Sequence, residues 1–170
     1  MFDRKTYEKR VEWYQHDRFG MFIHWGLYAI PARGEWVRST EEMPEDDYLP
    51  FFEEFNPMDY DPSKWAKAAK EAGMKYAVLT AKHHDGFCLF DSKLTDFKST
   101  NTKAGRDLVR EYLEAFRAEG LKVGLYYSCL TGIIRIIRTT ETGIIRCVTV
   151  KRKQMKAGIL SGILLICMDR

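Results

Sequence analysis

Residues 77–87 read Ala77-Val78-Leu79-Thr80-Ala81-Lys82-His83-His84-Asp85-Gly86-Phe87. A short apolar run gives way abruptly to polar and small residues, two of which are adjacent imidazoles. This pattern indicates a buried strand that ends at a functional edge, because parallel α/β folds bind ligands at the carboxyl ends of their strands. Three of the four histidines in the chain, at positions 24, 83 and 84, follow runs of this kind.

The segments on either side predict repeating β/α units. Three strands are expected, at residues 18–26, 75–81 and 121–128. Two amphipathic helices are expected between them, one starting at Asp61-Pro62-Ser63 and closed by Gly73, the other starting after residues 103–107 and closed by Gly120. Strands that alternate with helices predict a parallel sheet with right-handed crossovers, which is an α/β fold.

Two further segments lie before the second strand. Residues 5–17 are charged and aromatic and predict a short surface helix. Residues 29–54 contain Pro31, Gly34, Pro44 and Pro50, and we expect an irregular connection there. A connection of that length is more often functional than idle.

The composition changes sharply near residue 130. Residues 1–130 contain 19 Lys and Arg against 22 Asp and Glu, whereas residues 131–170 contain 8 against 2, within a total net charge of +3. Every Phe, Tyr, Trp and His also precedes Thr131. One evolved domain seldom changes in this way, so we divide the chain into residues 1–130 and a basic, Ile-rich tail at residues 131–170.

Other sequence features restrict the protein class. The 170 residues suffice for one domain but are few for a closed α/β barrel, which takes ~250. The four cysteines are widely spaced and predict no zinc or redox motif. We expect a cytoplasmic protein that neither enters nor binds a membrane, since the sequence shows neither a signal peptide nor an apolar run long enough to span one.

The polar residues at the strand ends are the candidates for a ligand site. A lone histidine is more often a buried core residue than a ligand, but His83 and His84 stand in tandem before Asp85, where Gly86 allows the chain to turn. A metal site competes with this interpretation, although adjacent residues rarely chelate one ion. Glu35 and Trp36 could bind a sugar through a carboxylate and an indole face, or be a solvated acid beside a partly buried ring.

Five strings of the chain resemble successive motifs of the family 29 α-L-fucosidases. They match in order and spacing over about residues 15–128, and the Lys-His-His-Asp-Gly-Phe string is quite specific. The strings are Arg18-Phe19-Gly20-Met21-Phe22-Ile23-His24-Trp25-Gly26, Glu35-Trp36, Leu79-Thr80-Ala81-Lys82-His83-His84-Asp85-Gly86-Phe87, Gly105-Arg106-Asp107-Leu108-Val109 and Gly124-Leu125-Tyr126-Tyr127-Ser128.

The resemblance implies a partial (β/α) TIM-like barrel of about three β/α units, and a retaining glycosidase acting on a fucosylated glycan or fucoside. It assigns contacts with fucose to six residues: His24, Glu35, Trp36, His83, His84 and Tyr126. It assigns no metal or cofactor. It also places the nucleophilic aspartate after a fourth strand and the acid/base further on, so we expect no catalytic carboxylate before residue 128 and an inactive, truncated chain.

The tail suggests a shifted reading frame. It contains Gly132-Ile133-Ile134-Arg135 and again Gly143-Ile144-Ile145-Arg146. Codons for this string, read one nucleotide earlier, can encode Trp or Arg followed by His-His-Pro, which resembles the continuation in many family members. A tandem repeat or a basic interaction tail is the alternative.

Two other functions compete with a truncated fucosidase. A non-catalytic module could use the same histidines and Trp36 to bind fucose or another sugar. A nucleic-acid-binding protein could use the basic tail, but the tail lacks aromatic residues and any recognised motif, so we expect no nucleic-acid partner.

Overall fold

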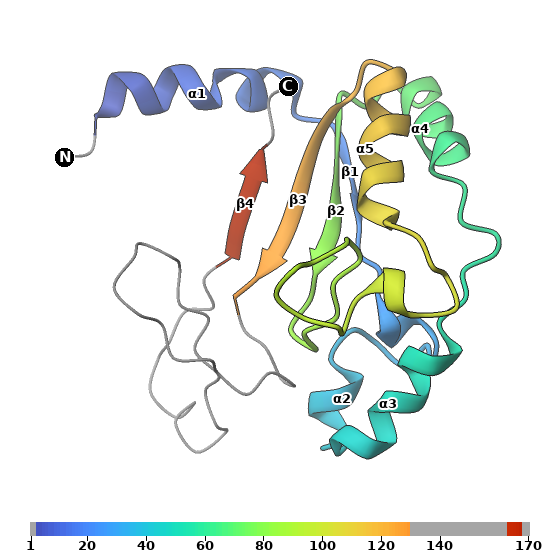
Figure 1. Ribbon diagram of the computed structural model, residues 1–170. Coiled ribbons are helices and arrows are strands. Elements are labelled where there is room, and N and C mark those ends of the chain that lie inside the picture. The colour runs from blue at the N-terminus through green and yellow to red at the C-terminus, as the bar shows by residue number, and fades with distance from the viewer. Residues whose placement is uncertain (1–2, 130–162, 168–170) are drawn as a thin grey trace.

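A computed structural model describes residues 3–129 and 163–167 (Figure 1). It contains an open α/β arrangement in which helices and strands alternate along the chain. The elements are α1 (Arg4–Asp17), β1 (Gly20–Ile23), the 3-10 turn η1 (Leu27–Ala29), α2 (Val37–Thr40), α3 (Glu45–Glu54), α4 (Pro62–Glu71), β2 (Tyr76–Lys82), the 3-10 turn η2 (Ser99–Asn101), α5 (Leu108–Ala118), β3 (Lys122–Ser128) and β4 (Ile163–Cys167).

The sheet has the order β1-β2-β3-β4, and its first three strands are parallel. Phe22 is paired with Val78, and Val78 with Gly124. Paired residues on neighbouring strands point to the same side of a sheet, so this row defines one face, which we call the inner face. The α/β prediction is confirmed. The described part of the barrel is partial, since its sheet does not close on itself.

Helices α4 and α5 cover the opposite, outer face of the sheet (Figure 1). Ala66 of α4, Tyr112 and Phe116 of α5 and Leu79 of β2 are all buried in one core. Burying such apolar surface is the main stabilising contribution of this layer. The helix starts follow the sequence, because Asp61 and Asp107 accept hydrogen bonds from backbone amides of the first turns of α4 and α5.

The expectation of an irregular connection at residues 29–54 is wrong, because α2 and α3 lie within it. Pro44 stands at the N-cap of α3, and the first turn carries three acidic residues that favour the positive end of the helix dipole. Pro50 lies inside α3, where it lacks an amide hydrogen for the helical ladder. Tyr48 is completely buried, so tertiary packing holds a helix that local propensity disfavours.

The tail contributes one strand that we had not predicted. Residues Ile163–Cys167 form β4, which pairs antiparallel with β3. Five consecutive uncharged residues fit the otherwise unpaired edge of β3. The expected tail boundary at residue 130 and the proposed frameshift concern residues that lie mostly outside the described ranges.

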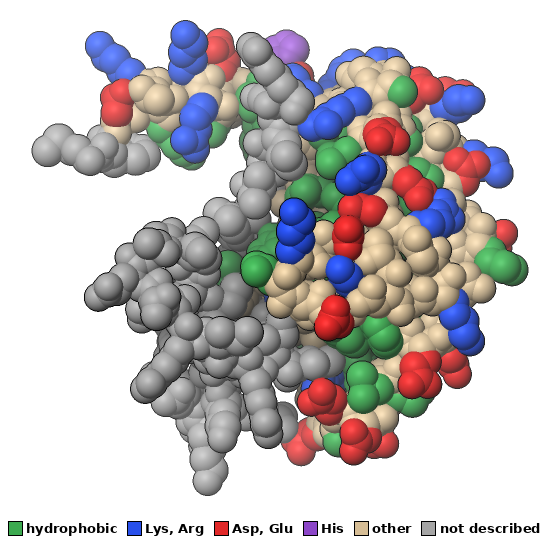
Figure 2. All heavy atoms as spheres, in the orientation of Figure 1, with side chains coloured by type: hydrophobic (Ala, Val, Ile, Leu, Met, Phe, Trp, Pro, Cys, Tyr) green, Lys and Arg blue, Asp and Glu red, His purple; other side chains and the backbone are tan. Residues whose placement is uncertain are grey.

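The amino and carboxyl ends of the parallel strands differ in what surrounds them. Helix α1 lies near the amino ends, and α2 and α3 lie near the carboxyl ends (Figure 1). Lys122 at the start of β3 forms an ion pair with Asp17 of α1 at 2.6 Å. On the face shown in Figure 2, acidic and basic side chains are interspersed over the helical layer. Within the described residues, no helix is long and apolar enough to cross a membrane.

Candidate active site

His24 follows β1 directly, and a threonine of β2 holds the chain at this point. The hydroxyl of Thr80 donates to the carbonyl of Trp25 at 2.6 Å and accepts from the Trp25 amide at 2.9 Å. The Tyr28 hydroxyl lies 2.9 Å from Nδ1 of His24. The imidazole of His24 is therefore oriented from η1 while remaining exposed to solvent.

His83 and His84 lie in a tight turn that begins where β2 ends. The Gly86 amide donates to the His83 carbonyl at 3.1 Å, and Gly86 has a φ of 93°. Only glycine adopts that angle without strain, so the predicted role of Gly86 is confirmed. His83 is buried, whereas His84 is partly exposed and its Nδ1 hydrogen bonds to the hydroxyl of Ser128 at the end of β3.

Five of the six predicted site residues form one cluster of rings at the carboxyl ends of the strands. The ring of His83 lies 4.8 Å from that of His24, 4.4 Å from that of His84 and 6.1 Å from that of Tyr126, measured between centroids. Trp36, from the segment before α2, lies 4.3 Å from His84. Three strand ends and one connecting segment thus converge on one place, which agrees with the grouping that the family resemblance implies.

Glu35 is the sixth predicted residue, and its charge acts on two histidines of the cluster. Its carboxylate is exposed and acts electrostatically on both His24 and His84, raising their pKa values against the larger opposing effect of burial. An exposed carboxylate beside imidazoles can accept hydrogen bonds from a polyol.

Burial keeps the imidazoles neutral. It lowers the pKa of His83 to about 3, assisted by repulsion from His84 and His24 in their protonated forms and from the ammonium of Lys82. Burial likewise lowers the pKa values of His24 and His84. Nδ1 of His83 is buried and has no hydrogen-bond partner within the described part of the chain. Buried polar atoms are nearly always paired, so this nitrogen is a candidate ligand contact.

Sequence reasoning missed several residues that hold the cluster in place. Tyr28 lies four residues beyond His24 and carries no motif of its own. Ser128 ends the Tyr-Tyr-Ser string, but its bond to His84 depends on the register of β2 against β3. The alternation along β3 requires only that Tyr126 and Tyr127 point to opposite faces, and the structure packs Tyr126 against Phe22 and His24.

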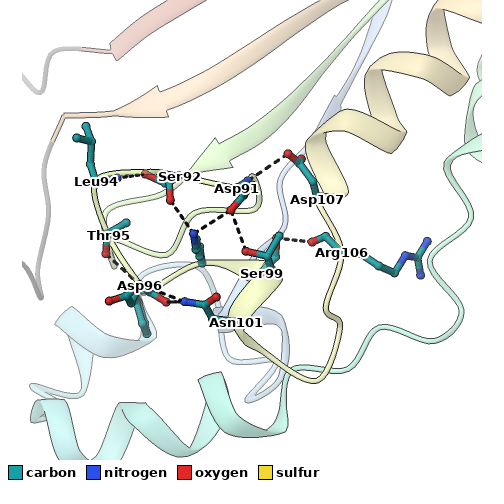
Figure 3. Close-up of polar contacts among 12 residues, drawn as sticks. Asp91, Ser92, Leu94, Thr95, Asp96, Ser99, Asn101, Arg106 and Asp107 are labelled. Carbon is teal, nitrogen blue, oxygen red and sulfur yellow. Dashed lines mark hydrogen bonds and ion pairs between the residues drawn. The ribbon is translucent and has the colours of Figure 1, made fainter.

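The loop after the histidine turn is tied to α5 by polar contacts (Figure 3). Asp91 accepts a hydrogen bond from Lys98 at 2.8 Å, and its amide donates to Asp107 at 3.2 Å. Asp107 also caps α5 by accepting from the Arg110 amide at 2.9 Å. The Gly-Arg-Asp string therefore fixes the far end of this loop and contributes no side chain to the ring cluster.

Elsewhere among the described residues, a hollow lies apart from this cluster. A hollow of about 840 Å³ between the start of α4 and α5, lined by Arg106 and Glu111 among others, shares no residue with it. No group of three or more His, Cys, Asp or Glu among the described residues could hold a metal ion.

The ends of the parallel strands bring together neutral imidazoles, an indole and a carboxylate. This arrangement defines the class of the protein, an α/β protein with a polar ligand site at the carboxyl edge of its sheet. A model of the family described as Alpha-L-fucosidase matches residues 2–154. The chain belongs to the α-L-fucosidase family.

Individual relatives agree with this assignment. Tissue alpha-L-fucosidase of Rattus norvegicus is 37% identical over 133 residues, which are 68% of this chain and 29% of that protein. Alpha-L-fucosidase isoenzyme 1 from Paenibacillus thiaminolyticus is 73% identical with a TM-score of 0.72, over 73% of this chain and 30% of that one.

A family 29 α-L-fucosidase from Bacteroides thetaiotaomicron, trapped as a covalent intermediate in complex with 2-fluoro-fucosyl fluoride, is 42% identical with a TM-score of 0.66. The match covers 69% of this chain and 29% of that one. The chain thus spans about three tenths of the length of these relatives.

Proposed function

We propose that residues 20–128 form the fucose-recognition part of an α-L-fucosidase active site, and that the substrate is a fucosylated glycan or another α-L-fucoside. The observation that carries this proposal is the convergence of His24, His83, His84, Trp36 and Tyr126 at the carboxyl ends of three parallel strands. The sixth predicted contact, Glu35, stands beside them. Membership of the family supplies the identity of the sugar.

The chemistry of the cluster suits a deoxy sugar. A neutral imidazole carries one donor and one acceptor nitrogen, so each histidine can bind a sugar hydroxyl without attracting anions. The half-exposed indole of Trp36 offers an apolar face for the C–H side of a sugar ring. Glu35 can accept from two hydroxyls at once.

We infer that the chain as given does not hydrolyse fucosides. Retaining hydrolysis needs two carboxyl groups ~5–5.5 Å apart, one of them a nucleophile. Two carboxylates, Glu35 and Asp85, lie in the strings that carry predicted site residues. Asp85 is buried and binds Tyr48 and the Phe87 amide through separate oxygens. It is therefore engaged by the protein and poorly placed to attack a sugar. Glu35 alone cannot supply both functions.

Hydrolysis of an aryl α-L-fucoside by the purified 170-residue chain tests this inference. We expect no release of the phenol above the uncatalysed rate, because loss of a nucleophile or acid/base normally costs orders of magnitude. Turnover that disappears in Glu35→Gln or Asp85→Asn would contradict the inference and place a catalytic carboxylate within residues 1–128.

A second candidate is a sugar-binding module whose role is binding alone, favoured by the same ring cluster without a catalytic pair. The two candidates differ in affinity for L-fucose. A partial active site contacts one side of the sugar, so its Kd should be about millimolar, equivalent to ~4 kcal/mol. A module selected for binding should hold L-fucose at micromolar concentration, which isothermal titration calorimetry would distinguish.

We also propose that residues 131–170 are an out-of-frame readout without a selected role. The support is the composition change at residue 130 and the repeated Gly-Ile-Ile-Arg string. Sequencing the locus and translating all three frames tests this. The proposal predicts a His-His-Pro continuation in another frame, followed by an aspartate after a fourth strand. Frames rich in stop codons without that string would overturn it.

A further inference from the structure

Asp85 is a buried acid within the histidine turn, next to the ring cluster. Only 7% of its surface is exposed. Its Oδ1 accepts from the Phe87 amide at 3.1 Å, and its Oδ2 accepts from the Tyr48 hydroxyl at 2.8 Å. Burying a carboxyl group is costly unless its oxygens are bonded, so this arrangement requires both partners.

The bond to the Phe87 amide makes Asp85 part of the turn itself. The same turn contains the bond from the Gly86 amide to the His83 carbonyl. An aspartate that bonds the amide two residues further on stabilises a tight turn. Asp85 therefore fixes the backbone path of the turn after His83 and His84. That path determines where the two imidazoles lie relative to His24 and Trp36.

Tyr48 comes to this arrangement from a distant part of the sequence. It belongs to α3, is completely buried, and reaches Asp85 across 37 residues of chain. The guanidinium carbon of Arg38, two residues after Trp36, lies 5.3 Å from the centroid of the Tyr48 ring. The segment that carries Glu35 and Trp36 is thereby joined to the histidine turn.

We propose that Tyr48 and Asp85 are a pair of positioning residues that holds the His83–His84 turn in register with the Glu35–Trp36 segment for sugar binding. The pair touches no substrate. It acts through the turn on one side and through α2 and α3 on the other. This inference rests on the proposed function, since it names the residues that align the two halves of the fucose contact.

The pair also makes binding depend on pH. Burial raises the pKa of Asp85, and the Tyr48 hydroxyl opposes that rise by stabilising the carboxylate. Burial and the nearby Asp85 charge raise the pKa of Tyr48, so Tyr48 stays protonated and donates. The titratable or charged groups that face Asp85 from the packed elements are Lys82 of β2, Tyr28 of η1, Arg38 of α2 and Tyr48 of α3.

The test compares Tyr48→Phe with the matched control Tyr60→Phe in the full chain. Tyr60 is also buried and its hydroxyl donates at 2.7 Å, but to the Leu108 carbonyl on the outer side of the sheet. Titration with L-fucose, followed by NMR, should show an affinity about tenfold lower in Tyr48→Phe, since charge-assisted bonds are the strong ones. Tyr60→Phe should stay within about twofold of the original chain, as its lost bond is not at the site.

A pH profile separates positioning from a general loss of stability. Without the Tyr48 hydroxyl the pKa of Asp85 rises further, so the acid-side midpoint of L-fucose affinity should move to higher pH in Tyr48→Phe. Asp85→Asn should remove that midpoint, and adding Tyr48→Phe to it should cost no further affinity, as coupled residues are not additive. Equal effects of Tyr48→Phe and Tyr60→Phe, or an unchanged midpoint in Asp85→Asn, would overturn the proposal.

A measurement without ligand keeps the two proposals distinguishable. If the original chain binds no L-fucose, the proposed function fails, and the side-chain ¹⁵N signals of His83 and His84 in the free protein then decide the positioning role. Tyr48→Phe should shift both sets of signals and Tyr60→Phe neither. Signals unchanged in Tyr48→Phe would refute the pair whatever the outcome with fucose.

Discussion

The two faces of the sheet differ in the way they use their residues. On the outer face, Leu79 of β2 packs in a continuous apolar core with Tyr112 and Phe116 of α5. The inner face changes along the strands from glycines and aromatic rings at the amino end to imidazoles at the carboxyl end. A hollow of about 250 Å³ lies beside its amino end, lined by Trp13, Phe22 and Tyr76 among others.

This difference implies that the outer face contributes mainly to the stability of the fold, whereas the carboxyl end of the inner face contributes mainly to ligand binding. The outer face is lined by apolar side chains, and those of its central strand, Ala77, Leu79 and Ala81, are buried, so truncation there should be costly. On the inner face a ring lies directly against the backbone instead, since a Cβ on Gly20 would collide with the Tyr76 ring. The carboxyl end of the inner face carries the imidazoles and the indole of the ring cluster. Their removal should change the pH dependence of stability or the affinity for sugar more than the free energy of unfolding at neutral pH.

The largest expected effect is on the outer face. Phe116→Ala should lower the free energy of unfolding by about 3–5 kcal/mol, because Phe116 is completely buried against Tyr112 and truncation leaves a cavity. Urea denaturation followed by circular dichroism measures it. A loss below about 1 kcal/mol would mean that this layer does not support the sheet and that the two faces do not differ in their contribution to stability.

A smaller effect is expected where the inner face carries a buried imidazole. His83 has a pKa of about 3 in the folded chain against 6.5 when solvated. Below pH 6.5, His83 is therefore protonated in the unfolded chain but stays neutral in the folded chain. Between pH 6.5 and 5 this should cost about 2 kcal/mol of stability, measured by denaturation at each pH.

His83→Gln is the control for that pH dependence. Asp85 acts in the opposite direction, because burial raises its folded pKa and protonation then favours the folded chain. The variant keeps Asp85 and removes only the histidine, so the difference in slope between the two chains belongs to His83. Parallel slopes would show that His83 is solvated and that the polar end of the inner face is open.

The smallest expected effect is at the exposed edge. Trp36→Ala should leave the free energy of unfolding within about 0.5 kcal/mol, because the indole is 46% exposed. It should still weaken L-fucose binding about 3–10-fold, since an aromatic face contributes ~0.5–1.5 kcal/mol. A destabilised variant with unchanged affinity would assign Trp36 to the core instead of the site.

Local patterns predicted the outer layer well. The aspartates before α4 and α5, the glycines after them and the apolar runs of β2 and β3 each specify an element within a few residues. Gly73 and Gly120 adopt positive φ angles, as helix-terminating glycines do. The meeting of His24 with His83 was also predictable, because neighbouring parallel strands end at one edge.

Long-range contacts account for what the sequence did not predict. Helix α3 contains Pro50 and exists because Tyr48 and its neighbours pack in the core, which no local pattern records. The contact of His84 with Ser128 depends on a register shift between β2 and β3 after Thr80. The pairing of β4 with β3 likewise joins residues far apart in the chain.

In the proposed function the polar end of the inner face recognises fucose, and a stereochemical titration tests this recognition. The full chain is titrated with L-fucose and, in parallel, with its mirror image D-fucose, while side-chain signals of His24, His83, His84 and Trp36 are followed by NMR. The account predicts saturable shifts of these signals with L-fucose at about millimolar Kd and none with D-fucose. Equal responses to both sugars, or shifts confined to residues outside this cluster, would contradict it.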